Sequence, residues 1–178
     1  SNCLQVSLIG YTNAGKSTIM NALTNSGLLV EDRLFATLDS TTRLLEEDSR
    51  PKVLLSDTVG FISNLPHEVI AAFRSTLATV RDADLLLQVI DADDNIEEHL
   101  QTTSEVLEDL DAACIPIIKV FNKIDRISPT RLLILEKSFP EALFGSYENG
   151  GKNGLEKNLA FVEQLRKHIL LFFNKRMK

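Results

Sequence analysis

The stretch Gly10-Tyr11-Thr12-Asn13-Ala14-Gly15-Lys16-Ser17-Thr18 matches the pattern G-x-x-x-x-G-K-[ST], in which a glycine-rich loop binds phosphates. A short β-type run over residues 4–9 precedes it, and a helical pattern follows. The two glycines would let successive backbone N–H groups point at a polyphosphate. Lys16 would then reach the β- and γ-phosphates as a catalytic cation, and the Ser17 hydroxyl would bind Mg²⁺. We therefore predict that residues 10–18 form a nucleotide-phosphate site.

The composition is that of an ordinary globular domain of 178 residues, 44% of them hydrophobic and 25% charged. The net charge of −6 argues against direct sequence-specific nucleic-acid binding by this domain. Cys3 and Cys114 form no metal-ligand or disulfide pattern, which is typical of a reducing compartment. No apolar run is long enough to span a bilayer, and no signal peptide is visible. We expect one cytoplasmic domain over residues 1–178. Because the sequence begins without methionine, at Ser1-Asn2, we expect either that it is excised from a longer protein or that foreign residues precede it.

Strand and helix patterns alternate along the chain, which indicates an α/β sheet covered by helices on both faces. Two expected strands are joined by only four residues, 48–51, so they must be antiparallel. Residues 28–42 lack periodicity and are expected to form a functional loop. We predict a six-stranded mixed sheet with strands near 4–9, 43–47, 52–57, 84–91, 115–121 and 142–145. The expected helices begin at Lys16 and then cover about 69–80, 96–110, 129–137 and 155–172, the last one after a glycine-rich loop at 149–154.

Three polar motifs follow expected strands, where open α/β sheets bind their ligands. They are the phosphate loop, residues 57–60 and residues 122–125. Asp-x-x-Gly alone would be more typical of a plain turn, but the three motifs together are far more specific. The Asp57 carboxylate suits the hard cation Mg²⁺, and Gly60 would let its N–H approach the γ-phosphate as a catalytic donor. We therefore predict that the second motif lines the nucleotide through Asp57, Thr58, Val59 and Gly60.

The motif Asn122-Lys123-Ile124-Asp125 predicts which base is bound. A carboxylate accepts hydrogen bonds from two adjacent donors, and guanine offers N1–H and its 2-amino group side by side. Adenine would present a lone pair to Asp125, a mismatch that costs several kcal/mol. Asn122 would connect the base to the phosphate loop, and the Lys123 stem would lie over the ring. We therefore expect guanine selectivity.

The remaining charged groups have simpler interpretations. His67, His99 and His168 have no mutual spacing that suggests a site. Acidic residues after the fourth strand are expected to stabilise the start of the next helix rather than to bind a metal: Asp91, Asp93, Asp94, Glu97 and Glu98. Basic residues near the end of the last helix are expected to complement its dipole: Arg166, Lys167, Lys175, Arg176 and Lys178.

Together these motifs resemble the HflX family of GTPases over nearly the whole chain. The resemblance includes Phe35-Ala36-Thr37-Leu38-Asp39, followed by Thr41-Thr42-Arg43. It implies a Ras-like fold, Mg²⁺-dependent hydrolysis of GTP to GDP, and association of the full-length protein with the large ribosomal subunit. It also implies that residues 35–39 contact the nucleotide and that Thr37 is both a catalytic residue and a metal ligand. The residues alone leave Thr41 and Thr42 open for that role.

Two positions depart from the family's pattern. Ser40 stands where the family has proline, which should loosen the loop. The family's Ser-Ala guanine loop is not evident, and either Gly145-Ser146 or Ser146-Tyr147 could fill its place. We expect a backbone N–H of Ser146 or Tyr147 to reach guanine O6.

These features predict a GTP-hydrolysing molecular switch, whose loops near 30–42 and 58–66 order around the γ-phosphate. The alternative is a guanine-nucleotide-binding scaffold with negligible hydrolysis, which single-turnover phosphate release would distinguish. An ATP-dependent kinase or ATPase is disfavoured by residues 122–125 and by the lack of an evident site for a second substrate.

Overall fold

The structure of the chain is a computed structural model, and it describes residues 3–24, 42–45, 50–58, 68, 77–147 and 152–176. Within the last range, only the backbone is described for residues 152–157. The predicted loop over 28–42, apart from Thr42, and most of the predicted helix over 69–80 lie outside these residues. Across the described part of the chain, no helix has the length and apolar character needed to cross a bilayer.

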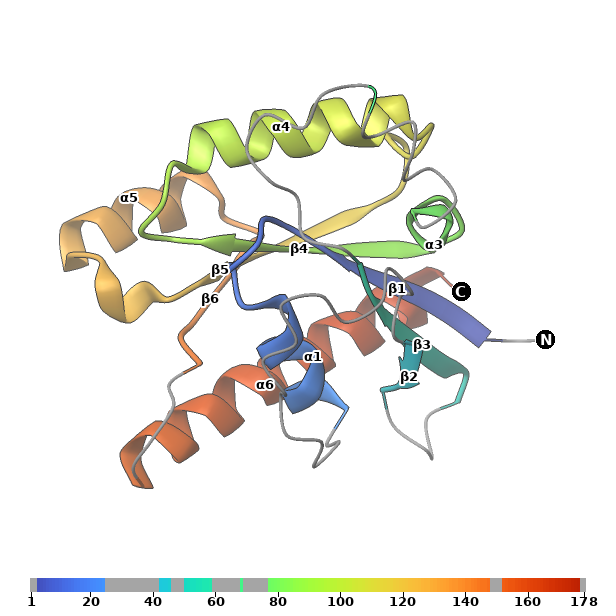
Figure 1. The fold of residues 1–178 in the computed structure, drawn as a ribbon. Helices are drawn as coiled ribbons and strands as arrows, with labels where there is room; N and C mark the ends of the chain where they lie inside the picture. Colours follow the sequence, from blue (N-terminus) through green and yellow to red (C-terminus); the bar gives the residue numbers. More distant parts are fainter. Residues whose placement is uncertain are drawn as a thin grey trace.

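A six-stranded mixed sheet forms the centre of the molecule, in the order β2-β3-β1-β4-β5-β6 (Figure 1). Neighbouring strands are parallel except for β2, which pairs antiparallel with β3 because only a short connection separates the two. The predicted fold class is therefore confirmed. The strands are β1 (Cys3–Ile9), β2 (Thr42–Leu44), β3 (Lys52–Asp57), β4 (Leu85–Asp91), β5 (Ile117–Asn122) and β6 (Leu143–Phe144).

Helices cover both faces of this sheet (Figure 1). On one face lie α1 (Lys16–Leu23) and α6 (Lys152–Arg176). On the other lie α3 (Ala78–Arg81), α4 (Ile96–Asp109) and α5 (Pro129–Ser138). A single 3₁₀ turn, η1 (Ile124–Arg126), follows β5. The first helix begins immediately behind the phosphate loop, so the loop lies at the edge of the sheet where the parallel strands end.

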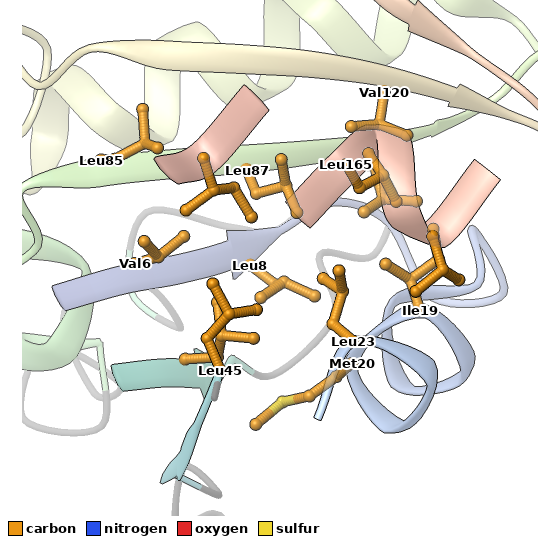
Figure 2. Packing of buried hydrophobic residues seen from close by; sticks show 14 of the residues in the cluster. Val6, Leu8, Ile19, Met20, Leu23, Leu45, Leu85, Leu87, Val120 and Leu165 are labelled. Atoms are coloured by element: carbon orange, nitrogen blue, oxygen red, sulfur yellow. The ribbon is translucent and has the colours of Figure 1, made fainter. Parts of the chain in front are cut away.

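Alternation along the central strands sends side chains to the two faces of the sheet, where they pack into three buried clusters. In β4, Leu85, Leu87 and Val89 face α1 and α6, whereas Leu86 and Ile90 face the helices on the other side. Figure 2 shows the first of these clusters, with Leu85 and Leu87 packed among side chains from β1, α1 and α6. Each fully buried leucine contributes about 1.5–3 kcal/mol. This packing fixes the strand ends that carry the polar motifs.

The last helix differs most from its prediction. It begins at Lys152 rather than near 155, so part of the expected glycine-rich loop is helical, and it ends at Arg176. A glycine inside a helix costs only about 1 kcal/mol relative to alanine and does not forbid it. The inward face carries Phe161 and Phe173, while Leu159 is 56% exposed. The second strand is also displaced from its expected start at residue 43, because it pairs with β3 from Thr42 to Leu44.

Candidate nucleotide-binding site

The phosphate loop joins β1 to α1 through two glycines in the left-handed region. Gly10 has φ 147° and Gly15 has φ 101°. A Cβ at Gly10 would collide with the Val89 carbonyl oxygen, and one at Gly15 would collide with the Asn122 amide nitrogen. Both positions therefore require glycine for conformation and for close approach. The loop is closed by a hydrogen bond from Ala14 N to the Tyr11 carbonyl oxygen at 3.2 Å.

Lys16 starts α1 and is buried, with 7% of its surface exposed. Its ammonium donates a long hydrogen bond of 3.5 Å to the Tyr11 carbonyl oxygen. Burial lowers the pKa of Lys16 below its ordinary value of 10.5, and the nearby Asp57 carboxylate acts in the opposite direction. A desolvated cation at a helix N-terminus is well placed to bind a polyphosphate.

The two predicted metal ligands within the described residues lie side by side. Ser17, on the first turn of α1, donates a hydrogen bond of 3.0 Å from Oγ to Oδ2 of Asp57, at the end of β3. The other carboxylate oxygen, Oδ1, is buried and has no hydrogen-bond partner within the described residues. Burial raises the pKa of Asp57 above 3.8, although Lys16 and the Ser17 hydrogen bond lower it. A hydroxyl beside an unpartnered carboxylate oxygen is a donor set that fits Mg²⁺.

Protein groups alone do not complete a metal site in the described part of the chain, where no cluster of three or more His, Cys, Asp or Glu side chains could hold an ion. Magnesium often keeps one or two protein ligands and takes the rest from phosphates and water. The pair formed by Ser17 and Asp57 therefore suits a metal that arrives with a nucleotide.

The base motif is tied directly to the phosphate loop. The Asn122 side chain is buried and donates from Nδ2 to the Ala14 carbonyl oxygen at 3.0 Å. Its Oδ1 accepts a hydrogen bond of 3.3 Å from the backbone N–H of Tyr147. Lys123 has a left-handed φ of 62°, and its ammonium donates to the Asn13 carbonyl oxygen at 2.5 Å. These contacts join the two loops into one unit.

The structure brings the predicted guanine O6 loop against the same motif. The Asp125 backbone N–H donates to Ser146 Oγ at 3.0 Å. The Ile124 N–H donates to the Gly145 carbonyl oxygen at 3.3 Å. Asp125 itself is exposed, so its carboxylate is accessible to a ligand. Ser146 and Tyr147 thus lie beside Asn122 and Asp125, where a bound base could meet all four residues.

Asp91 does not act as predicted. The helix α4 is capped by Asn95, whose side chain accepts the N–H of Glu98 at 3.3 Å, and Glu97 and Glu98 occupy its first turn. Asp91 instead forms an ion pair with Lys123, with Oδ2 and Nζ 2.9 Å apart. The two residues are far apart in sequence and meet because β4 and β5 are neighbouring strands. Spacing along the chain gave no signal for this pair.

Sequence reasoning also missed a contact between the phosphate loop and α4. The Tyr11 ring is buried and stacks on His99, with ring centroids 3.7 Å apart and planes 16° apart. His99 Nε2 lies 3.4 Å from Asp94 Oδ2. The histidine was expected to belong to no site, but it supports the first variable residue of the phosphate loop. Only the tertiary arrangement could reveal this contact.

Several predicted site residues lie outside the described residues: Phe35, Ala36, Thr37, Leu38, Asp39, Val59 and Gly60. Thr42, one of the rivals for the switch role, is in β2, and its Oγ1 lies 3.1 Å from Ser56 Oγ. Thr58 donates from Oγ1 to the Leu8 carbonyl oxygen at 2.6 Å, so its hydroxyl fastens the second motif to β1. The roles assigned to residues 35–39 and 59–60 stay predictions.

Sequence comparison relates this chain to known GTPases, in agreement with a nucleotide-binding site. A family model described as "50S ribosome-binding GTPase" matches residues 5–123. The GTPase HflX of Gluconacetobacter diazotrophicus is 46% identical over 175 residues, which cover 98% of this chain and 37% of that protein. The GTPase HflX of Escherichia coli is 50% identical over 123 residues, or 68% of this chain and 29% of that protein. The chain therefore spans about a third of the curated relatives that it matches.

Solved structures show the same fold. A GTP-binding protein from Sulfolobus solfataricus, solved in complex with GDP, has a TM-score of 0.69 and 28% identity, over 97% of this chain and 53% of that chain. The FeoB G domain from Methanococcus jannaschii has a TM-score of 0.59 and 24% identity, over 95% of this chain and 96% of that domain. At that identity the second likeness concerns the fold alone.

Proposed function

Because the chain belongs to the 50S ribosome-binding GTPase family, we propose that it binds GTP and GDP with Mg²⁺ and hydrolyses GTP as a molecular switch. The observation that carries this proposal is the convergence of three motifs at one edge of the sheet. Ser17 contacts Asp57, Asn122 contacts the Ala14 carbonyl, and Lys123 contacts the Asn13 carbonyl. A triphosphate, a divalent metal and a base each find suitable groups there.

The phosphates would lie along residues 10–18, where the loop N–H groups, the N-terminus of α1 and Lys16 supply positive potential. Ser17 and Asp57 would hold Mg²⁺, together with Thr37 from the switch loop, and the ion would neutralise charge on the β- and γ-phosphates. In hydrolysis, a water oxygen bonds to the γ-phosphorus while the bond to the β–γ bridging oxygen breaks, which gives GDP and inorganic phosphate. Lys16 and the Gly60 N–H would stabilise the charge that develops on the transferred group.

Guanine would be selected by Asp125, whose carboxylate can accept both N1–H and the 2-amino group. The Lys123 stem would cover one face of the ring, and a backbone N–H at Ser146 or Tyr147 would donate to O6. Support for this arrangement comes from the contacts that gather these residues around Asn122 and Asp125.

The whole protein would associate with the large ribosomal subunit in the cytoplasm, with residues 1–178 forming a single GTP-binding domain within it. The description of the matching family, "50S ribosome-binding GTPase", supports this partner. The part of those relatives that this chain does not span would be available for ribosome contact. The competing proposal is a scaffold that binds guanine nucleotide and scarcely hydrolyses it.

Two measurements test the proposal. Equilibrium competition should rank GDP and GTP far above ADP and ATP, and removal of Mg²⁺ should weaken GTP binding. Single-turnover phosphate release should then show slow hydrolysis by the domain. Equal competition by ATP would contradict guanine binding, whereas tight GTP binding without phosphate release would favour the scaffold.

A further inference from the structure

Asp91 is a charged residue at the nucleotide edge of the sheet that the proposed chemistry does not use. It ends β4 and stands in register with Asn122 of β5, and the next N–H, that of Ala92, donates to the Asn122 carbonyl oxygen at 2.9 Å. It comes two residues after Val89, whose side chain packs in the core formed with α1 and α6. Strand alternation therefore places the Asp91 carboxylate on the same face as the phosphate loop.

Both carboxylate oxygens of Asp91 are engaged, each by a different group. Oδ1 accepts the backbone N–H of Asp93 at 2.9 Å and so closes the turn after β4. Oδ2 contacts the Lys123 ammonium at 2.9 Å. The ion pair is largely removed from water, with 16% of the Asp91 side chain and 20% of the Lys123 side chain exposed. Removing one partner of an ion pair that is shielded from water costs more free energy than removing one partner of an exposed pair.

Lys123 is the link between this pair and the phosphate loop. The same ammonium that contacts Asp91 also donates to the Asn13 carbonyl oxygen at 2.5 Å. Lys123 has a left-handed φ of 62°, and its flexible four-carbon stem carries a compact charge whose position depends on the contacts that the ammonium makes. Without a counter-ion, the ammonium would lose one of the two contacts that hold it.

We propose that Asp91 is a positioning residue that holds Lys123 on the Asn13 carbonyl and thereby slows the release of guanine nucleotides. This inference rests on the proposed function, since it concerns the same site. Asp91 acts through Lys123. The carboxylate keeps the lysine stem extended between the base motif and the phosphate loop, and a bound base would lie against that stem. The two loops then open together rather than separately.

Because the two carboxylate oxygens of Asp91 have different partners, a substitution can remove one contact and keep the other. Asp91→Asn retains an Oδ1 that can accept the Asp93 N–H, so the turn can persist, but it replaces Oδ2 with an amide that repels the ammonium. Lys123→Met keeps an unbranched apolar stem and removes the ammonium. Asp93→Asn, on the same turn, is the matched control because only its backbone N–H contacts Asp91.

The readout is the dissociation rate of a fluorescent GDP derivative from each variant, measured by displacement with unlabelled GDP. We expect Asp91→Asn and Lys123→Met each to accelerate release about tenfold, and Asp93→Asn to stay within about twofold of the wild type. The double variant should release no faster than Lys123→Met alone, because Asp91 then has no ammonium to hold. Failure of the wild-type chain to bind GDP would instead overturn the proposed function.

Two outcomes would overturn the role of Asp91. One is an Asp91→Asn variant that releases GDP as slowly as the wild type. The other is a double variant in which the two accelerations multiply, since Asp91 would then act independently of Lys123. This cycle also separates positioning from general destabilisation, because a loss of stability would persist in the Lys123→Met background.

Discussion

Lys16 and Asp57 place opposite charges in a part of the molecule that is poorly hydrated. Burial lowers the pKa of the lysine and raises that of the carboxyl, so the environment disfavours the charged form of both groups. Each partly compensates the other, but Asp57 Oδ1 has no hydrogen-bond partner among the residues that the structure describes. Groups held in this way are typical of sites that a ligand completes, because a metal and a polyphosphate would supply the missing interactions.

The raised pKa of Asp57 predicts a pH-dependent stability difference between the wild type and Asp57→Asn. A carboxyl whose pKa is raised by folding binds more protons in the folded than in the unfolded chain. Its contribution to stability therefore grows as the pH falls toward 3.8, and it is lost as the pH rises through the folded pKa. Asparagine does not titrate. The unfolding temperature of the wild type without nucleotide should therefore rise relative to that of the variant as the pH is lowered from about 7 toward 3.8. A difference that stays constant with pH would contradict the shift.

Asp125→Asn should change the base that the domain prefers. The amide can no longer accept both guanine donors, whereas xanthine offers an N1–H and a 2-carbonyl that match its oxygen and its NH₂. We expect GDP affinity to fall roughly 10²-fold and xanthosine diphosphate to become the better ligand, as measured by competition binding. Arg126→Gln, on the same 3₁₀ turn, serves as the control. Unchanged preference for GDP in Asp125→Asn would exclude this carboxylate from base selection.

At the scale of elements, α6 holds α1 in place through a residue whose role was predicted wrongly. Arg166 was expected to lie near the helix end and complement the dipole, but α6 continues to Arg176, so Arg166 is internal and buried. Its guanidinium donates to the Leu23 carbonyl oxygen at 2.9 Å, at the last residue of α1, and it also contacts Glu163. The helix that begins at the phosphate loop is thus capped at its other end by α6.

Arg166→Met should therefore destabilise the domain without changing which base it binds. Methionine fills a similar volume but leaves the Leu23 carbonyl without this donor, at a cost of about 1–3 kcal/mol in the free energy of unfolding. Denaturant unfolding measures this loss, and Lys167→Met, at an exposed neighbouring position, is the control. Equal effects of the two substitutions would mean that the cap contributes nothing.

The elements differ in how far local sequence specifies them. The phosphate loop and the buried strands could be predicted because their signals are local: glycines at fixed spacing, and apolar runs bounded by turns. The pair of Ser17 and Asp57 followed from the rule that parallel strands end at one edge. Three contacts depend on how distant elements meet, and the spacing of residues along the chain does not predict them. They are the ion pair of Asp91 with Lys123, the stack of Tyr11 on His99 and the cap by Arg166.

For the whole molecule, the important fact is that this chain covers only about a third of relatives such as the HflX GTPase of Gluconacetobacter diazotrophicus. It nevertheless contains all three polar motifs, and their contacts are internal to it. Nucleotide binding is therefore expected of the chain by itself, whereas fast turnover is not. The reason lies in the residue that follows the second motif.

That residue is Phe61, at the position where many GTPases have a glutamine that orients the attacking water. Phenylalanine has neither a donor nor an acceptor for this task. No arginine is evident in the sequence as an internal finger, although Arg33 and Arg43 lie in or beside the switch loop, and the Arg43 guanidinium donates to Asn21 Oδ1 at 2.9 Å. Lys16, Thr37, Mg²⁺ and backbone dipoles would be left to stabilise the transition state, with the water poorly positioned.

We therefore expect single-turnover hydrolysis by this chain at about 10⁻⁴ to 10⁻² s⁻¹, with marked acceleration of the full-length protein by large ribosomal subunits that help to order the water. Phosphate release is measured for the chain and for the full-length protein, each with and without subunits, under saturating Mg²⁺. Phe61→Leu is the informative variant, because an apolar replacement should leave the slow basal rate within a few-fold of the wild type if the ring has no chemical part in hydrolysis. Turnover near 1 s⁻¹ by the chain without any partner would contradict this mechanism, since it would require a water-orienting group that the sequence does not supply at position 61.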